Sequence, residues 1–268
     1  SDTIEAPIWR SGARSLNYGR AGSCTARRAP MICSTGLAAR FQGRGDPTSH
    51  HRPQYPEFVQ RQRRRVKGVN VRYRDEIRTI ANSRSVRYLL HFTQAVNLAG
   101  IVRHGLLSRS ELDKPEHLAY ASDYVRRDGN DQAVSVSVSR LNATMFALKR
   151  KNTGNRNWVV LVLSAEVLWT HTCLFCWRNA AKKEIKEHRG WRGGPWAFSK
   201  MFDGSDQERS GLAPYEPTDP EAEVQVLEPI APQWILGAVV NDPDMLEPVQ
   251  VILNGLTGAQ RPVAVDDF

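Results

Sequence analysis

Short apolar runs of strand length are the feature of this sequence that most limits its possible folds. The longest, residues 158–163, suits a buried strand and is much too short to cross a membrane, so no membrane partner is expected. Further strand-like runs lie at residues 86–92, 133–138, 224–226, 236–240 and 250–253. Helical spacing of apolar residues predicts helices over residues 75–81, 94–104 and 141–149, with Gly105 ending the second. Because helices and strands do not alternate regularly, the predicted fold class is α+β.

Charge is divided unevenly along the chain of 268 residues, which is long enough for one large domain with an extension. The net charge is +9, but residues 1–74 hold 15 Lys and Arg against 4 Asp and Glu, while residues 75–268 hold 22 against 24. We therefore predict a basic N-terminal extension over residues 1–74 and a folded domain over residues 75–268. Such asymmetry is typical of chains that bind a polyanion, most often nucleic acid, and a solvated basic arm is the alternative.

The four cysteines, Cys24, Cys33, Cys173 and Cys176, do not resemble a disulfide framework in a chain of this length. A reducing, cytoplasmic location is therefore expected, and residues 1–10 lack the basic start and apolar centre of a secretion signal. Cys173 and Cys176 form a single C-x-x-C pair, whereas a structural zinc site needs four ligands. We expect two buried cysteines there and no metal site.

A His-x-Thr pair closes the first strand-like run. His91 and Thr93 lie two residues apart, so their side chains point to the same side of a strand. Two hydrogen-bonding side chains in that arrangement suit the vicinal hydroxyls of a ribose. The alternative is that His91 is a structural residue whose hydrogen bonds are satisfied within the protein.

Two pairs of charged residues are also candidates for chemistry. Arg126 and Arg127 precede a turn and could hold a diphosphate through bidentate hydrogen bonds, or could be a solvated basic pair. Glu221 and Glu223 share a face if their segment is a strand. Two neighbouring carboxylates suit stabilisation of a cationic sugar and removal of a proton from a nucleophile, and solvent-facing acids on an edge strand are the alternative.

Aromatic and basic residues are interleaved over residues 182–200. Trp191, Trp196 and Phe198 could stack bases of a single strand while the Lys and Arg residues neutralise phosphates. The alternative is that these aromatic side chains belong to the core.

Taken together and in this order, the motifs resemble the DarT family of DNA ADP-ribosyltransferase toxins over about residues 75–245. The resemblance is carried by His91, Thr93, Asn97, Leu98, Gly100 and Ile101, by Ala119-Tyr120-Ala121 before Arg126-Arg127, and by Glu221-Ala222-Glu223. Asn179-Ala180-Ala181, Ala197-Phe198 and Pro217-Thr218-Asp219 look more like the guanine-directed branch of the family than the thymine-directed one.

The resemblance implies an ADP-ribosyltransferase fold, with a split, mixed β core, flanking helices and NAD⁺ in the cleft. It assigns NAD⁺ binding to His91, Phe92, Thr93, Asn97, Gly100, Leu107 and Tyr120. It matches Glu223 to the catalytic glutamate, which contacts the nicotinamide ribose and stabilises the oxocarbenium-like state. Glu221 stands where the family often has Gln, and either glutamate could accept the proton of the attacking base. Arg126, with Arg127 behind it, would hold phosphate or orient the base, and the Arg-x-Asp-Gly pattern favours Arg126.

The resemblance further implies NAD⁺ as co-substrate without a metal, single-stranded DNA as target, and a toxin countered by a DarG-type macrodomain antitoxin. A single strand presents the edge of a base without the cost of flipping it out of a duplex. Two alternatives stay open. RNA or a protein arginine is a possible target, because a Glu-x-Glu pair occurs in arginine-directed ADP-ribosyltransferases. An inactive nucleic-acid-binding module is the other.

Overall fold

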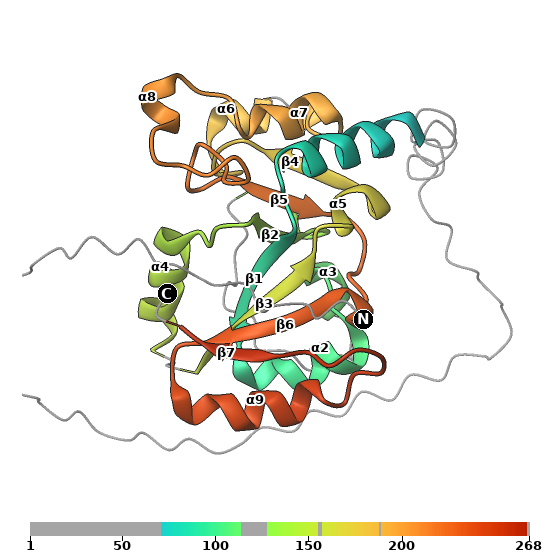
Figure 1. Cartoon of the computed structure of the whole chain (residues 1–268), viewed down its shortest axis with the longest axis vertical. Coiled ribbons are helices and arrows are strands. Elements are labelled where there is room, and N and C mark those ends of the chain that lie inside the picture. The colour runs from blue at the N-terminus through green and yellow to red at the C-terminus, as the bar shows by residue number, and fades with distance from the viewer. Residues whose placement is uncertain (1–70, 114–127, 155–156, 188, 267–268) are drawn as a thin grey trace, which may run out of the picture. The chain divides into compact units, whose positions relative to one another are not determined.

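The computed structural model describes residues 71–113, 128–154, 157–187 and 189–266 (Figure 1). Within them, strands form one sheet in the order β4-β5-β2-β1-β3-β6-β7. The strands are β1 (Tyr88–Gln94), β2 (Val134–Val138), β3 (Trp158–Ser164), β4 (Cys173–Cys176), β5 (Glu223–Val226), β6 (Ile235–Val240) and β7 (Val263–Val265). The pairs are antiparallel except for the parallel pair β6–β7, so the sheet is mixed. The predicted α+β class is confirmed.

Helices flank both ends of this sheet. They comprise residues 71–83, α2 (Leu98–His104), α3 (Arg109–Leu112), α4 (Ala143–Thr153), α5 (Val167–Thr170), α6 (Lys183–Glu187), α7 (Pro195–Lys200), α8 (Asp206–Arg209) and α9 (Leu246–Leu253). Short 3₁₀ turns lie at η1 (Ala95–Asn97), η2 (Arg189–Trp191), η3 (Pro232–Trp234) and η4 (Pro243–Met245). In Figure 1, α6, α7 and α8 gather beside β4 and β5, and α2 and α9 lie beside β6 and β7. Among the described residues, no helix is long and apolar enough to span a membrane.

The sheet is divided where β1 meets β2. β1 pairs with β3 along its whole length, from Tyr88 opposite Ser164 to Gln94 opposite Trp158. With β2 it pairs only through Leu89 and Leu90. The halves β4-β5-β2 and β1-β3-β6-β7 are thus joined by a short ladder and diverge beyond it. The expected split, mixed β core is confirmed.

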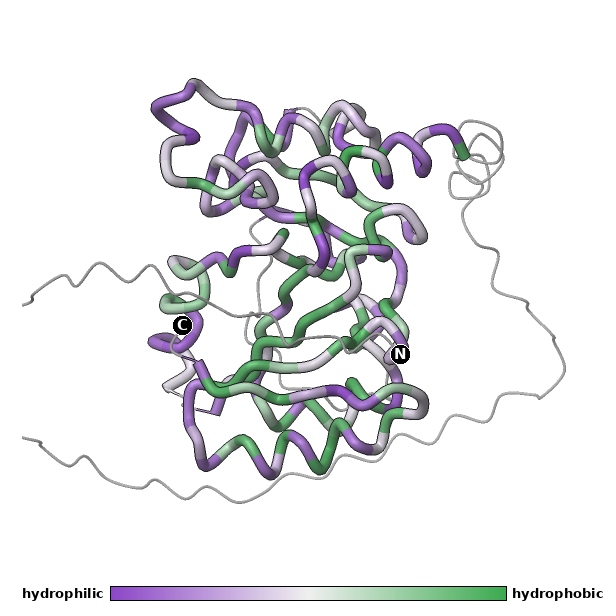
Figure 2. Tube along the Cα trace, in the orientation of Figure 1, coloured by the Kyte–Doolittle hydropathy of each residue, from purple (hydrophilic) through white to green (hydrophobic). Residues whose placement is uncertain are grey.

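The core lies mainly against one face of the sheet. Its largest cluster brings together buried side chains from both halves, such as Leu89, Leu161, Phe175 and Phe198. A smaller cluster on the other face contains Leu90, Val160 and Val239, with Phe92 packed against it. Figure 2 shows the hydrophobic residues concentrated along the strands, while hydrophilic residues follow the outer turns of the helices.

The strand predicted at residues 250–253 is wrong, because these residues form the end of α9. The run is rich in β-branched residues, which favour strands. The helix instead buries Val249 and Leu253, four residues apart, and leaves Val251 exposed. The other predicted helices are found with shifted ends, and Gly105 caps α2 at φ 83° as predicted. A Cβ there would lie 2.4 Å from the Ile230 carbonyl oxygen, so glycine is required.

Candidate active site

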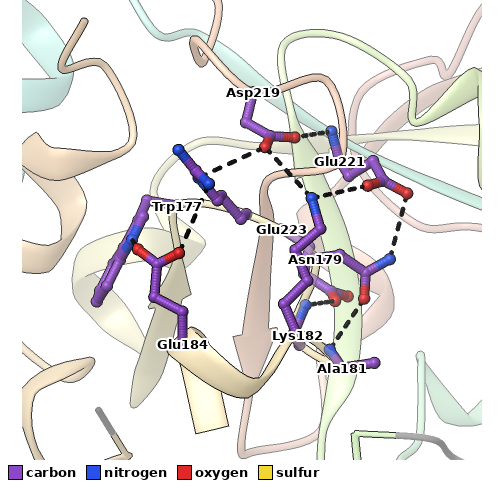
Figure 3. A network of polar contacts seen from close by, with 10 residues as sticks. Trp177, Asn179, Ala181, Lys182, Glu184, Asp219, Glu221 and Glu223 are labelled. Carbon is purple, nitrogen blue, oxygen red and sulfur yellow. Dashed lines mark hydrogen bonds and ion pairs between the residues drawn. The ribbon is translucent and has the colours of Figure 1, made fainter. Parts of the chain in front are cut away.

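Glu223 is the first residue of β5 and lies opposite Cys176, the last residue of β4. Because the strands are antiparallel, the chain leaves β4 beside the start of β5. The backbone N–H of Ala180 in that segment donates a hydrogen bond to Glu223 Oε1 at 3.1 Å. A half-buried carboxylate is thereby held in one orientation by main-chain geometry (Figure 3).

Glu221 lies outside the strand, so the expectation that both glutamates share a strand face is not met. They are brought together instead by the residues after β4. Asn179 Nδ2 donates to Glu221 Oε1 at 3.4 Å, and Lys182 Nζ lies 3.2 Å from Glu221 Oε2. Asn179 Oδ1 in turn accepts from the backbone N–H of Ala181 at 2.9 Å. Residues 179–182 therefore contact both carboxylates, as Figure 3 shows.

The two glutamates have different electrostatic surroundings. Glu221 forms an ion pair with Lys182, whose ammonium also lies 3.8 Å from Asp219 Oδ2. Asp219 Oδ1 accepts from the Glu221 backbone N–H at 2.8 Å. These partly exposed ion pairs contribute only about 0–1 kcal/mol each. Their main effect is to order the turn before β5, where Glu221 pairs with a lysine while Glu223 accepts from a backbone N–H.

Gln225, two residues beyond Glu223, is fully buried and joins three segments. Its Nε2 donates to Asp128 Oδ2 at 2.5 Å, and its Oε1 accepts from Asn130 Nδ2 at 3.0 Å and Arg192 Nη1 at 3.3 Å. Asp128 directly follows the Arg126-Arg127 pair in sequence. Gln225, Asn130 and Arg192 were not identified from the sequence, although a glutamine in the apolar strand Val-Gln-Val was a usable signal.

The C-x-x-C pair lies in β4, and both cysteines are unpaired and buried, as predicted. Burial raises the pKa of the Cys176 thiol to about 12, and its sulfur accepts from Arg192 Nη1 at 3.0 Å. Burial also raises the pKa of Cys173. Within the described residues, no group of three or more His, Cys, Asp or Glu side chains is arranged to hold a metal ion.

The His-x-Thr pair lies where β1 and β2 diverge. The ladder between these strands ends at Leu90, and the next residue, His91, makes a hydrogen bond of 2.9 Å from Nδ1 to the Ser135 carbonyl oxygen. A carbonyl only accepts, so Nδ1 carries the proton. Thr93 Oγ1 accepts from Asn97 Nδ2 at 3.2 Å, which ties the strand end to the start of α2. β2 separates this group from β5 and Glu223 in the sheet.

The remaining residues expected to bind NAD⁺ differ in their surroundings. The Phe92 ring packs on Phe146 and Trp158, with ring centroids 5.1 and 6.0 Å away, so its side chain serves packing. Gly100 lies in α2, and a Cβ there would meet nothing within 4 Å, so packing does not require glycine. Leu107 follows the β-bridge from Leu106 to Ile230. Tyr120, Arg126 and Arg127, like residues 1–70 of the expected extension, lie outside the described residues.

The three aromatic residues in 182–200 differ in how far they are buried. Phe198 is fully buried and contacts Phe175, so for this residue the core interpretation is confirmed. Trp191 and Trp196 are 73% and 52% exposed. A cavity of about 370 Å³ is lined by Trp177, Arg178, Glu184, Lys200, Met201, Asp203, Glu208, Thr218, Asp219 and Pro220.

Comparison with known proteins gives one family. The family model for DarT, described as ssDNA thymidine ADP-ribosyltransferase, matches residues 90–267, which include His91, Thr93, Glu221 and Glu223. No curated protein matches this chain.

Three solved structures illustrate the likeness in fold. Thermosipho africanus DarTG in complex with ADP-ribose has 15% identity and a TM-score of 0.46, over 67% of this chain and 50% of that one. Thermus sp. 2.9 DarT in complex with NAD⁺ has 18% identity and a TM-score of 0.44, and the match covers 67% of this chain and 94% of that one. The same Thermus DarT in complex with ADP-ribosylated ssDNA has 20% identity and a TM-score of 0.45, and the match covers 67% of this chain and 93% of that one. The chain thus spans half of the Thermosipho protein, and the family assignment rests on the family model.

Proposed function

We propose, because the chain belongs to the DarT family, that it transfers ADP-ribose from NAD⁺ to a base of single-stranded DNA. The family match confirms the resemblance inferred from the sequence. The family model is described by thymidine, whereas the sequence details favour the guanine-directed branch. Guanine as the target base stays a prediction for the experiment below.

The observation that carries the proposal is the Glu223 carboxylate, held at the start of β5 by the Ala180 N–H. In the proposed reaction the bond between ribose C1′ and the nicotinamide nitrogen breaks, and nicotinamide leaves as a neutral molecule with the bonding pair. Positive charge develops on the ribose, and Glu223 stabilises it. Preorganised charge of this kind is commonly worth about 10²–10³ in rate.

The second half of the reaction needs a proton acceptor. A base nitrogen attacks C1′, a new C–N bond forms, and the nitrogen loses its proton to a carboxylate and then to water. Glu223 and Glu221 are the candidates. Glu221 is paired with Lys182 and joined to the same segment as Glu223 through Asn179, so its proposed part is to orient the attacking base.

NAD⁺ is proposed to bind where β1 and β2 diverge. His91 and Thr93 would contact the ribose, and Asn97 would hold Thr93 in position through the observed hydrogen bond. Further contacts are proposed for the backbone of Phe92 and for Gly100, Leu107 and Tyr120. Arg126, supported by Arg127, is proposed to bind phosphate or the target base, and Gln225 holds Asp128, which follows that pair in the chain.

Two wider roles are proposed on the same basis. The first is a toxin whose modification is removed by a DarG-type macrodomain antitoxin. The second is a nucleic-acid-binding extension, residues 1–74, attached to a catalytic domain over residues 75–268, with its excess of positive charge suited to phosphates.

Mass spectrometry of oligonucleotides incubated with protein and NAD⁺ tests the proposal. A mixed single strand should gain one ADP-ribosyl group, and strands lacking either guanine or thymine identify the base. RNA and an arginine-rich protein serve as competing acceptors. Transfer only to RNA or arginine, or binding of nucleic acid without nicotinamide release, would replace the proposal by one of its alternatives.

A further inference from the structure

We propose that Trp196 and Trp191 form a stacking platform for the bases that flank the modified nucleotide. The proposal rests on the proposed function and specifies how the same site holds its single-stranded substrate. The two side chains are called the tryptophan platform below.

Exposure of the two indoles is the first observation. Trp191 is 73% exposed and Trp196 52%, although tryptophan is ordinarily well buried. They are not scattered, because their ring centroids lie 6.4 Å apart at an interplanar angle of 70°. Adjacent exposed aromatic rings are typical of a binding surface. The two rings meet at an angle and are not stacked on each other, so a large part of each ring stays exposed.

The platform is built on a well-packed support. Gly194 precedes α7, Pro195 occupies its first turn, and Trp196 follows directly. The same helix buries Phe198 against Phe175 of β4, with ring centroids 4.8 Å apart. A rigid aromatic surface loses little conformational entropy when a base stacks on it.

The platform is linked to the glutamates through Trp177, which is itself buried. The Trp177 ring lies 5.6 Å from that of Trp196, and its Nε1 donates to Glu184 Oε1 at 3.3 Å. Trp177 immediately precedes residues 178–182, which contact Glu221 and Glu223. Trp177 and Asp219 also line the cavity of about 370 Å³. The platform is thus connected to the glutamates through Trp177 and residues 178–182, and we propose that it holds bases next to the one that reacts at Glu223.

The cation beside the Trp196 ring suits a polyanion as the occupant. Lys200 Nζ lies 5.6 Å from the centre of the Trp196 ring, and Lys200 also lines the cavity. Residues 182–200 contain six Lys and Arg against two Glu, but Arg192 is buried, and Lys182, Lys183 and Lys200 each form an ion pair with a carboxylate. Aromatic faces beside cations are the combination with which proteins bind single strands without reading their sequence. The occupant is therefore taken to be single-stranded nucleic acid and not an apolar protein surface.

The first test compares the variant Trp191→Ala/Trp196→Ala with wild type for binding a 5′-labelled single strand, followed by fluorescence anisotropy without NAD⁺. We expect Kd to rise by about tenfold for each base that no longer stacks. Trp191→Phe/Trp196→Phe should restore most of the affinity, because phenyl rings still stack. Val251→Ala, at an exposed apolar position on α9, is the matched control and should bind as wild type does.

The second test removes the bases instead of the indoles. Abasic sites placed one by one beside the reacting nucleotide should weaken wild-type binding at one or two positions, and the same sites should have little effect in the double alanine variant. Release of nicotinamide from NAD⁺ alone should be unchanged in the variant. This coupling is specific to stacking, since a general loss of stability would lower affinity for all strands equally.

The outcomes separate the platform from the proposed function. An unchanged Kd in the double alanine variant, with normal transfer by wild type, would overturn the platform alone and leave the surface to a protein partner. Base-dependent coupling in a protein that transfers nothing to DNA would retain the platform and overturn the proposed function.

Discussion

The Glu223 carboxylate accepts a hydrogen bond from the backbone N–H of Ala180, at 3.1 Å, across 43 positions of sequence. A main-chain donor aims at a carboxylate more reproducibly than a flexible side chain does. The contact exists because β4 and β5 are antiparallel, with Cys176 opposite Glu223. The orientation of the proposed catalytic group therefore follows from strand pairing.

Glu223→Gln should abolish transfer while leaving the fold intact. The amide oxygen can still accept from Ala180, so the melting temperature should change little. The negative charge facing the cationic ribose is lost, so kcat should fall by about 10²–10³. Nicotinamide release under saturating NAD⁺ and DNA is the measurement.

Glu228→Gln is the matched control for this change. The Glu228 carboxylate accepts a hydrogen bond from Thr172 Oγ1 at 2.8 Å, but Glu228 follows the end of β5 opposite to Glu223. Its variant should retain wild-type activity. Normal turnover by the Glu223 variant would remove that residue from the mechanism.

Gln225→Leu should destabilise the protein by about 2–4 kcal/mol. Leucine fits the buried position but leaves the buried Arg192 and the half-buried Asp128 and Asn130 without the amide that joins them, and unsatisfied buried groups are costly. Urea unfolding measures the loss. Gln207→Leu, at an exposed position in α8, should change the free energy of unfolding by less than about 0.5 kcal/mol.

His91→Ala should weaken binding of NAD⁺ more than binding of DNA, as measured by calorimetric titration. His91 also bridges the diverging strands through Ser135, so a purely structural role must be separated from a binding role. His91→Asn keeps a donor near the position of Nδ1 and should preserve the melting temperature while NAD⁺ binding stays weak. If the Asn variant binds NAD⁺ normally, the imidazole is a structural bridge.

The buried thiol of Cys176 should make stability fall at alkaline pH. Burial raises its pKa from 9.0 to about 12, so between these values the folded state binds more protons than the unfolded state. The contribution is fully present below pH 9 and is lost as pH rises toward 12, by up to about 1.4 kcal/mol per pH unit. Comparing the pH slope of wild type with that of Cys176→Ala isolates this thiol, and identical slopes would contradict the prediction.

Deleting residues 1–68 should raise the apparent KM for DNA and leave nicotinamide release from NAD⁺ alone nearly unchanged. The deletion removes the cluster Arg61, Arg63, Arg64, Arg65 and Lys67. The slope of log K against log salt should shrink by roughly 0.7 for each phosphate that the protein no longer neutralises. A lower melting temperature with an unchanged slope would show instead that the segment packs on the domain.

Much of the fold was predictable from the sequence, because apolar periodicity is a local property. Strand-length runs around His91 and Trp158 predicted the two longest paired strands, and Gly105 ended its helix as expected. The order of the motifs also identified the family, because the positions of His91, Thr93 and Glu223 along the chain can be compared without knowing their contacts. The failure at residues 250–253 has a local cause too, because Val and Ile favour strands while the spacing of Val249 and Leu253 suits a helix.

The sequence by itself thus determined the α+β class, the family and the identity of the candidate groups. Only the tertiary structure decided that Ala180 holds Glu223, that Gln225 joins Asp128 to Arg192, and that Trp196 is exposed while Phe198, two residues later, is buried. These contacts span up to 97 positions and depend on which strands are neighbours. Which strands pair depends on the apolar area buried by the whole sheet, and a short segment of sequence does not determine that total.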